Sequence, residues 1–236
     1  MHTGLYTDMK AIRKDEIVDD IHSMFVEQWD WEKVISKKDR TIDYLKKTVR
    51  NIYKAIKQTS IYVKKKYNNI KLDLPKTVFF ITSQNLEDLY PDKTPREREE
   101  LITRDKKAVF IIGIGDKLKS GIVHDLRSPD YDDWALDGDL LIFDETLGKA
   151  IELSSMGIRV DEKSLISQLE KSNCLDRLKL PYHQKIEKCE LPFTIGGGIG
   201  QSRILMLLLE KTNIAEIQAS SWETKTIKEL KEKIVL

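Results

Sequence analysis

The chain has 236 residues, of which 40% are hydrophobic and 33% charged. This length allows one sizeable core and is short for two full domains, so we expect a single domain over residues 1–236. The 40 Lys and Arg residues nearly balance the 39 Asp and Glu residues, which leaves a net charge of +1 and indicates no basic surface for nucleic acid. The two cysteines fit no zinc or redox motif, and neither a signal peptide nor a bilayer-length apolar run is present, so we expect a cytoplasmic protein.

Two strands are predicted near the N-terminus, at 5–13 and 24–31, with a charged loop between them. Alternation along the second strand places Val26, Gln28 and Asp30 on one face. A carboxamide next to a carboxylate suits the ammonium and carbonyl groups of an amino acid, because the pair both donates and accepts hydrogen bonds. The alternative is an exposed polar face on a strand whose tryptophans are buried.

The middle of the chain is predicted to be scaffold. Residues 41–67 have one apolar stripe and many lysines, which is typical of a long amphipathic helix. Thr94 before Pro95 is an N-cap signal for a helix that continues to Arg104. The other expected elements are strands at 77–82, 108–114, 138–143 and 149–160, and helices at 161–172, 182–188 and 224–234.

A glycine-rich stretch at 196–203 reads Gly-Gly-Gly-Ile-Gly-Gln-Ser-Arg, between a predicted strand at 191–195 and the apolar helical run 204–209. We therefore expect the glycines at a strand-to-helix junction, where the backbone can approach a ligand closely. The stretch matches neither the dinucleotide fingerprint nor the P-loop. What remains is a glycine floor with Arg203 one turn into the helix, and the alternative is a packed turn with a surface arginine.

The stretch resembles motif 3 of the class II aminoacyl-tRNA synthetases, a glycine-rich strand followed by a helix with an ATP-binding arginine. Longer segments resemble asparagine synthetase A, a family that makes asparagine from aspartate and ammonia; they lie at 4–13, 27–32, 124–134 and 152–160. The similarity runs from about Gly4 to the C-terminal end. It implies an α+β fold with an antiparallel sheet flanked by helices, as in the catalytic domain of class II aminoacyl-tRNA synthetases.

The resemblance implies ATP and Mg²⁺ as cofactors and a β-aspartyl-AMP intermediate, with release of AMP and pyrophosphate. Arg13, at the end of the first strand, matches the arginine that holds the α-phosphate, and Arg203 matches the motif 3 arginine; both are the expected catalytic residues. Asp139 and Glu152 occupy the metal-ligand positions, and hard divalent cations take carboxylate oxygens. The full set expected to bind the nucleotide is Arg13, Glu16, Ser23, Val26, Asp139, Glu152, Ser155, Gly198, Gly200 and Arg203.

The residues expected to bind L-aspartate are Gln28, Asp30, Ser154 and Arg159. Arg159 follows Glu152 at the separation that aspartyl-tRNA synthetases use between metal-binding glutamate and substrate-binding arginine. Charge-assisted contact with a carboxylate contributes roughly 1.5 to 3 kcal/mol, enough to favour aspartate over neutral amino acids. We expect Arg159 to hold the α-carboxylate, with the reverse orientation left open. For His124, in a polar loop expected at 124–134, a hydrogen-bonding role is favoured over that of a base for ammonia.

Members of the family carry a further N-terminal portion with motif 1, which builds the interface of their homodimer, whereas Met1 falls just before Gly4 here. On this ground we expect weak or absent synthetase activity, with nucleotide binding partly retained, and leave open how a dimer forms. Two alternatives are retained: an aspartyl- or asparaginyl-tRNA synthetase-like fragment, and a truncated non-catalytic nucleotide-binding paralogue.

Overall fold

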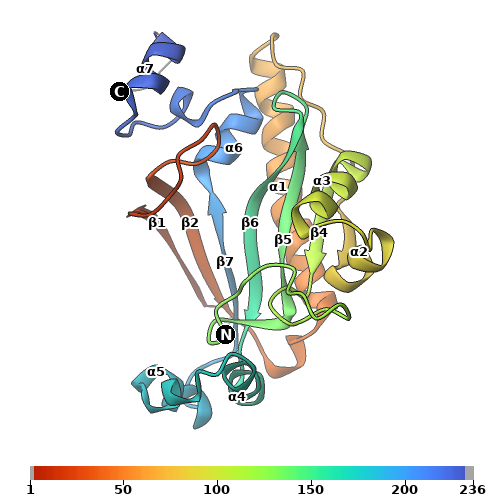
Figure 1. Ribbon diagram of the computed structural model, residues 1–236, viewed down its shortest axis with the longest axis vertical. Helices are drawn as coiled ribbons and strands as arrows, with labels where there is room; N and C mark the ends of the chain where they lie inside the picture. The colour runs from red at the N-terminus through yellow and green to blue at the C-terminus, as the bar shows by residue number, and fades with distance from the viewer. Residues whose placement is uncertain (1–2, 232–236) are drawn as a thin grey trace.

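The protein is described by a computed structural model over residues 3–231. It contains one seven-stranded sheet in the order β1-β2-β7-β6-β5-β4-β3 (Figure 1). The strands are β1 (Gly4–Ile12), β2 (Phe25–Val34), β3 (Phe79–Thr82), β4 (Ala108–Ile112), β5 (Asp132–Asp144), β6 (Lys149–Arg159) and β7 (Thr194–Gly200). The helices are α1 (Ile42–Lys66), α2 (Ser83–Leu89), α3 (Pro95–Lys106), α4 (Glu162–Lys171), α5 (Pro181–Glu187), α6 (Gln201–Leu208) and α7 (Thr224–Leu230), with short 3₁₀ turns η1 (Lys37–Asp39), η2 (Leu175–Lys179) and η3 (Ile214–Glu216).

The predicted sheet flanked by helices is confirmed, with one difference in strand direction. Neighbouring strands pair antiparallel except β3 and β4, which run parallel. A parallel pair needs a crossover connection, and α2 and α3 provide it between these two strands. The sheet is therefore mixed.

Alternation along β4 shows how the two faces of the sheet are covered. Phe110 belongs to the core that includes Leu45 and Val49 of α1, whereas Val109 and Ile111 belong to a cluster with residues of α2 and α3. Successive side chains of a strand point to opposite faces, so α1 covers one face and the α2–α3 pair covers the other at this end of the sheet. Over β2, β7 and β6 the second face is free to carry a site.

Most predicted elements lie where the sequence places them, and the N-caps of the two longest helices confirm where they begin. The helix predicted at 41–67 is α1, which begins after the N-cap Thr41. The helix predicted from Pro95 is α3, where Thr94 and Glu97 form a capping box. Helix α2 was not predicted. The prediction at 224–234 corresponds to α7, and positions 232–234 lie outside the described residues.

The strand-to-helix junction predicted at the glycines is confirmed, because β7 leads directly into α6, but the strand reaches Gly200 and does not end at residue 195. Gly196, Gly197 and Gly198 pair with both β2 and β6, and Gly200 pairs with β2. One prediction is corrected. The predicted loop at 124–134 ends early, because β5 begins at Asp132, which pairs with Arg159. In the part of the chain that the structure describes, no helix is both long and apolar enough to span a membrane.

Candidate active site

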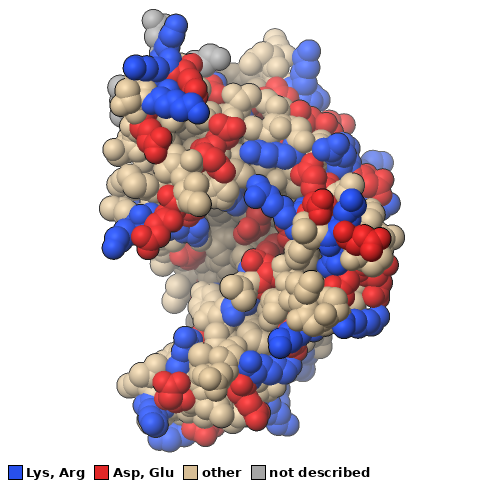
Figure 2. Space-filling model, viewed as in Figure 1, with Lys and Arg blue, Asp and Glu red and all other residues tan. Residues whose placement is uncertain are grey.

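A cavity of about 560 Å³ lies on the open face of the sheet, and it is lined by every predicted site residue except Asp139. Figure 2 shows this face hollowed near its middle, with acidic and basic side chains around the hollow. The predicted residues in the lining are Arg13, Glu16, Ser23, Val26, Gln28, Asp30, Glu152, Ser154, Ser155, Arg159, Gly198, Gly200 and Arg203. Segments far apart in the sequence thus converge on one pocket.

The glycines of β7 make room for polar side chains of the neighbouring strands. A Cβ atom at Gly198 would lie 2.9 Å from Asp30 Oδ1 and closer still to Gln28 Nε2. A Cβ atom at Gly196 would lie 2.5 Å from Arg159 Nη2 and closer still to a carboxylate oxygen of Glu32. Side chains from β2 and β6 therefore lie across β7. The glycines of this strand form the floor of the pocket and leave room for those side chains.

The predicted amino-acid end of the pocket contains an oriented amide–carboxylate pair. Gln28 Nε2 donates a hydrogen bond to Asp30 Oδ1 over 3.0 Å, so the two side chains share one face, as the alternation predicts. Ser154 Oγ donates to the carbonyl oxygen of Gly198 over 2.8 Å. The serine is held against the floor of the pocket by the backbone, which is consistent with a wall residue.

Arg159 has more acidic partners than the sequence suggests. Its Nε and Nη2 atoms donate to the carboxylate of Glu32 over 2.7 to 3.1 Å, and its Nη1 atom donates to Asp132. Nη2 also donates to Tyr131 Oη over 2.9 Å, and the guanidinium lies 3.8 Å from the centre of the Tyr131 ring. Burial raises the pKa of Asp132 to about 6, although Arg159 opposes this shift. The arginine is thus fixed before any substrate is bound.

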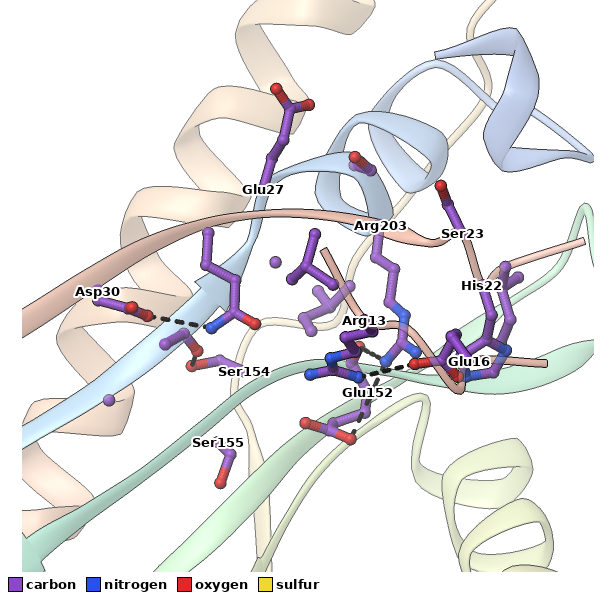
Figure 3. A pocket seen from close by; sticks show the side chains of 18 of the residues that line it. Arg13, Glu16, His22, Ser23, Glu27, Asp30, Glu152, Ser154, Ser155 and Arg203 are labelled. Carbon is purple, nitrogen blue, oxygen red and sulfur yellow. Dashed lines mark hydrogen bonds and ion pairs between the residues drawn. The ribbon is translucent and has the colours of Figure 1, made fainter. Parts of the chain in front are cut away.

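The predicted nucleotide end brings Arg13 and Arg203 to the same pocket. Figure 3 shows both arginines with Glu16 and Glu152 gathered at one end, away from Asp30. Arg13 Nη1 lies 3.1 Å from the Glu16 carboxylate, and Arg203 Nη1 donates to the Glu152 backbone oxygen over 3.1 Å. Two cations with exposed guanidinium edges can neutralise phosphate charge.

Asp139 and Glu152 come from adjacent strands, β5 and β6, and both line a second cavity of about 450 Å³. Arg203 and Glu152 line both cavities, so the two cavities adjoin each other at these side chains. Asp139 Oδ2 accepts from Arg127, while Oδ1 is buried without a hydrogen-bond partner. Desolvation raises the pKa of both carboxyls, and the Asp139 charge raises that of Glu152 further.

Asp139 and Glu152 can supply a divalent cation with two carboxylate ligands, but not with a complete set of protein ligands. No cluster of three or more His, Cys, Asp or Glu side chains able to hold a metal occurs among residues 3–231. Magnesium, however, commonly takes one or two carboxylates and completes its shell with water and nucleotide phosphates. The unpartnered oxygen of Asp139 and the half-exposed carboxylate of Glu152 provide that number.

Four further residues of the site were not predicted. Glu32 is two residues beyond Asp30 on β2 and therefore on the same face as Gln28 and Asp30, so the alternation of the strand could have predicted it. Arg127, Tyr131 and Asp132 line the pocket from the segment predicted as a loop, which the family resemblance singled out without assigning a role to any of the three. His124 lies in the second cavity, and its Nε2 atom is 2.9 Å from Glu99, which is the hydrogen-bonding role favoured above.

The fold and pocket define the class of protein. Over 89% of the chain, and 50% of the other protein, the fold superposes on asparaginyl-tRNA synthetase of Entamoeba histolytica in complex with asparaginyl-adenylate, at a TM-score of 0.62 and 15% identity. Aspartyl-tRNA synthetase from the same organism gives a TM-score of 0.59 at 19% identity, over 91% of this chain and 47% of that one. The architecture is therefore that of a class II synthetase catalytic domain.

Sequence comparison is more specific. A family model described as aspartate-ammonia ligase matches residues 1–234. The aspartate–ammonia ligase of Clostridium perfringens strain SM101 is 56% identical over 97% of this chain and 68% of its own length, and that of Lactobacillus johnsonii is 54% identical over 98% and 69%. The chain belongs to the aspartate–ammonia ligase family and spans about two thirds of these relatives. The family expected from the sequence is confirmed, and a tRNA synthetase fragment or a non-catalytic paralogue is not favoured. The expectation that the synthetase activity of this chain is weak stays a prediction.

Proposed function

We propose that this chain carries the catalytic site of an ATP-dependent, AMP-forming aspartate–ammonia ligase. The observation that carries the proposal is the convergence of Arg13 and Arg203 with Gln28, Asp30 and Arg159 on one pocket. Hydroxide is a poor leaving group, so an amide does not form directly from a carboxylate in water. Adenylation replaces hydroxide by AMP.

The proposed reaction has two steps. The β-carboxylate of aspartate attacks the α-phosphorus of ATP, forming β-aspartyl-AMP and releasing pyrophosphate. Ammonia then attacks the acyl carbon, and asparagine, AMP and a proton result. Holding two reactants in one orientation and neutralising charge account for most of the rate enhancement available to such a site.

The residues divide between the two substrates. On the family resemblance, Arg13 and Arg203 are assigned to the phosphates and Glu16 to the adenine side. Asp30 accepts from the α-ammonium of aspartate, and Gln28 orients Asp30 through their hydrogen bond. Arg159 holds the α-carboxylate with the one Nη1–H group that its protein partners leave available.

The remaining assignments complete the nucleotide site. Ser23, Val26, Ser155, Gly198 and Gly200 form its walls and floor. Asp139 and Glu152 would hold Mg²⁺, which supplies further neutralisation of phosphate charge when bound. The substrates are L-aspartate and ammonia, and no nucleic acid takes part.

The test is product analysis with aspartate, ammonium chloride, ATP and MgCl₂. Asparagine and AMP are expected in equal amounts, and Arg203→Ala is expected to lower the rate by roughly 10- to 100-fold, the loss of one or two charge-assisted contacts. Arg50→Ala is the control, because Arg50 is exposed on α1 and contacts the Phe80 ring outside both cavities. Formation of ADP in place of AMP, or an unchanged rate in Arg203→Ala, would contradict the proposal.

A further inference from the structure

The setting of Arg159 is defined by three side chains that the sequence did not predict. A guanidinium has five N–H groups. Four of them have acceptors: Nε–H and one Nη2–H on Glu32, the other Nη2–H on Tyr131, and one Nη1–H on Asp132. One Nη1–H is left without an acceptor among the described residues. A carboxylate that enters the pocket therefore meets a single donor in a fixed direction, unless it displaces a protein side chain.

Glu32 contacts the arginine from outside the lining of the pocket. Arg159, Tyr131 and Asp132 all line the cavity, but Glu32 does not. Glu32 takes the Nε–Nη2 edge of the guanidinium: its Oε2 atom accepts from both Nε and Nη2, and its Oε1 atom accepts from Nε. Several charge-assisted bonds to one edge fix the orientation of a guanidinium. Its side chain is 29% exposed, compared with 10% for Asp132.

The backbone is adapted to this contact. Glu32 pairs with Gly196 across β2 and β7, and any Cβ atom at Gly196 would collide with the Glu32 carboxylate and with Arg159 Nη2. The ion pair thus occupies the space of a missing side chain on the central strand. This adaptation is independent of the hydrogen bonds themselves.

We propose that Glu32 is a positioning residue for aspartate: it acts through Arg159, by fixing the guanidinium so that one N–H faces the substrate carboxylate. The assignment rests on the proposed function, because it takes Arg159 as the carboxylate-binding residue. Glu32 itself touches no substrate. Its loss leaves the arginine partly free to rotate, and aspartate binding weakens while nucleotide binding does not change.

The experiment measures binding of L-aspartate and of AMP separately, by calorimetry, to the full chain. In Glu32→Gln we expect the dissociation constant of aspartate to rise by about tenfold or more and that of AMP to stay within about twofold. In an Arg159→Lys background, where the guanidinium is absent, Glu32→Gln is expected to change the aspartate constant by less than about twofold.

The matched control is Glu87→Gln. Glu87 forms a buried pair with Arg98 over 3.1 Å, and neither residue lines either cavity. This variant is expected to lower the melting temperature without changing either dissociation constant. If Glu32→Gln does not fold, Glu32→Asp replaces it, since the shorter side chain keeps the charge but withdraws it from the Nε–Nη2 edge, and a rise of about fivefold in the aspartate constant is expected.

The outcomes separate the two proposals. Aspartate affinity unchanged in the Glu32 variant, or an equal effect of Glu32→Gln in the Arg159→Lys background, overturns the role of Glu32 and leaves the ligase function intact. A wild-type chain that binds AMP but no aspartate overturns the proposed function and the role of Glu32 together.

Discussion

At the scale of single residues, the site depends on the glycines of β7, which have no side chains, as much as on the charged groups around them. Gly196 and Gly198 have no side chain, so the side chains of Glu32, Gln28 and Asp30 lie flat over the strand. In that position the amide and carboxylate of β2 bond to each other and face the pocket. The glycines therefore act through the side chains of their neighbours.

This predicts a specific effect of Gly198→Ala. The added methyl group would displace Gln28 and Asp30, so we expect aspartate affinity to fall by at least about tenfold. Gly200→Ala is the comparison in the same strand, because its Cβ atom would meet nothing closer than Leu153 O at 3.7 Å, and aspartate affinity is expected to be kept. Titration calorimetry with L-aspartate checks both. Equal losses in the two variants would contradict the explanation.

At the scale of elements, α4 fixes the segment that carries Tyr131 and Asp132. Gln168 is 4% exposed and makes three hydrogen bonds to the backbone of that segment. Its Nε2 atom donates to the carbonyl oxygens of Pro129 and Asp132 over 3.0 and 2.9 Å, and its Oε1 atom accepts from Trp134 N over 2.9 Å. One buried side chain thus holds the wall of the pocket against a helix outside the sheet.

We predict that Gln168→Ala destabilises the fold by about 2 to 4 kcal/mol, because buried backbone groups lose their partners. It should also weaken aspartate binding, since Tyr131 and Asp132 support Arg159. Chemical denaturation and aspartate titration measure the two effects. Gln184→Ala is the control, because Gln184 makes one exposed 3.3 Å bond to Lys179 O. A Gln168 variant as stable as the control would show that the three bonds contribute little.

At the scale of the whole molecule, the α4–α5 region is tied to the sheet by ionic contacts at Asp130. Asp130 accepts from Ser128 Oγ at 2.6 Å, His183 Nε2 at 2.8 Å and Arg177 Nη1 at 3.0 Å. Partial burial opposes ionisation of Asp130, but these hydrogen bonds outweigh it and lower its pKa from 3.8 to about 2. The carboxylate form is therefore favoured by folding.

The sign of the pH effect follows from the lowered pKa. The contribution of Asp130 is fully present above its unfolded pKa of 3.8 and is lost as the pH falls towards about 2. We expect Asp130→Asn to lower the free energy of unfolding at pH 5 by on the order of 1 kcal/mol, a value reduced by solvent screening, and by less at pH 2.5. Urea denaturation of both proteins at the two pH values tests this. A difference that grows on acidification would contradict it.

The sequence by itself determined the family, most elements and the identity of most pocket residues. Strand alternation was enough to put Gln28 and Asp30 on one face, and the glycine–arginine stretch was enough to indicate a ligand site. These features are local, because they depend on spacing within one segment. The same alternation reaches Glu32, but its contact with Arg159 could not be predicted, because Arg159 lies far along the chain on another strand.

Tertiary structure alone decided which groups meet. The glycines were predicted at a strand-to-helix junction, which β7 and α6 confirm, but only the pairing of β7 between β2 and β6 shows that they clear space for side chains. Tyr131 and Asp132 enter the site because Asp132 pairs with Arg159 at the start of β5 and Gln168 of α4 holds the backbone around them, contacts that no spacing in the sequence encodes. Long-range packing sets such distances, since a strand's sequence fixes the face on which a side chain lies but not the neighbour that it faces.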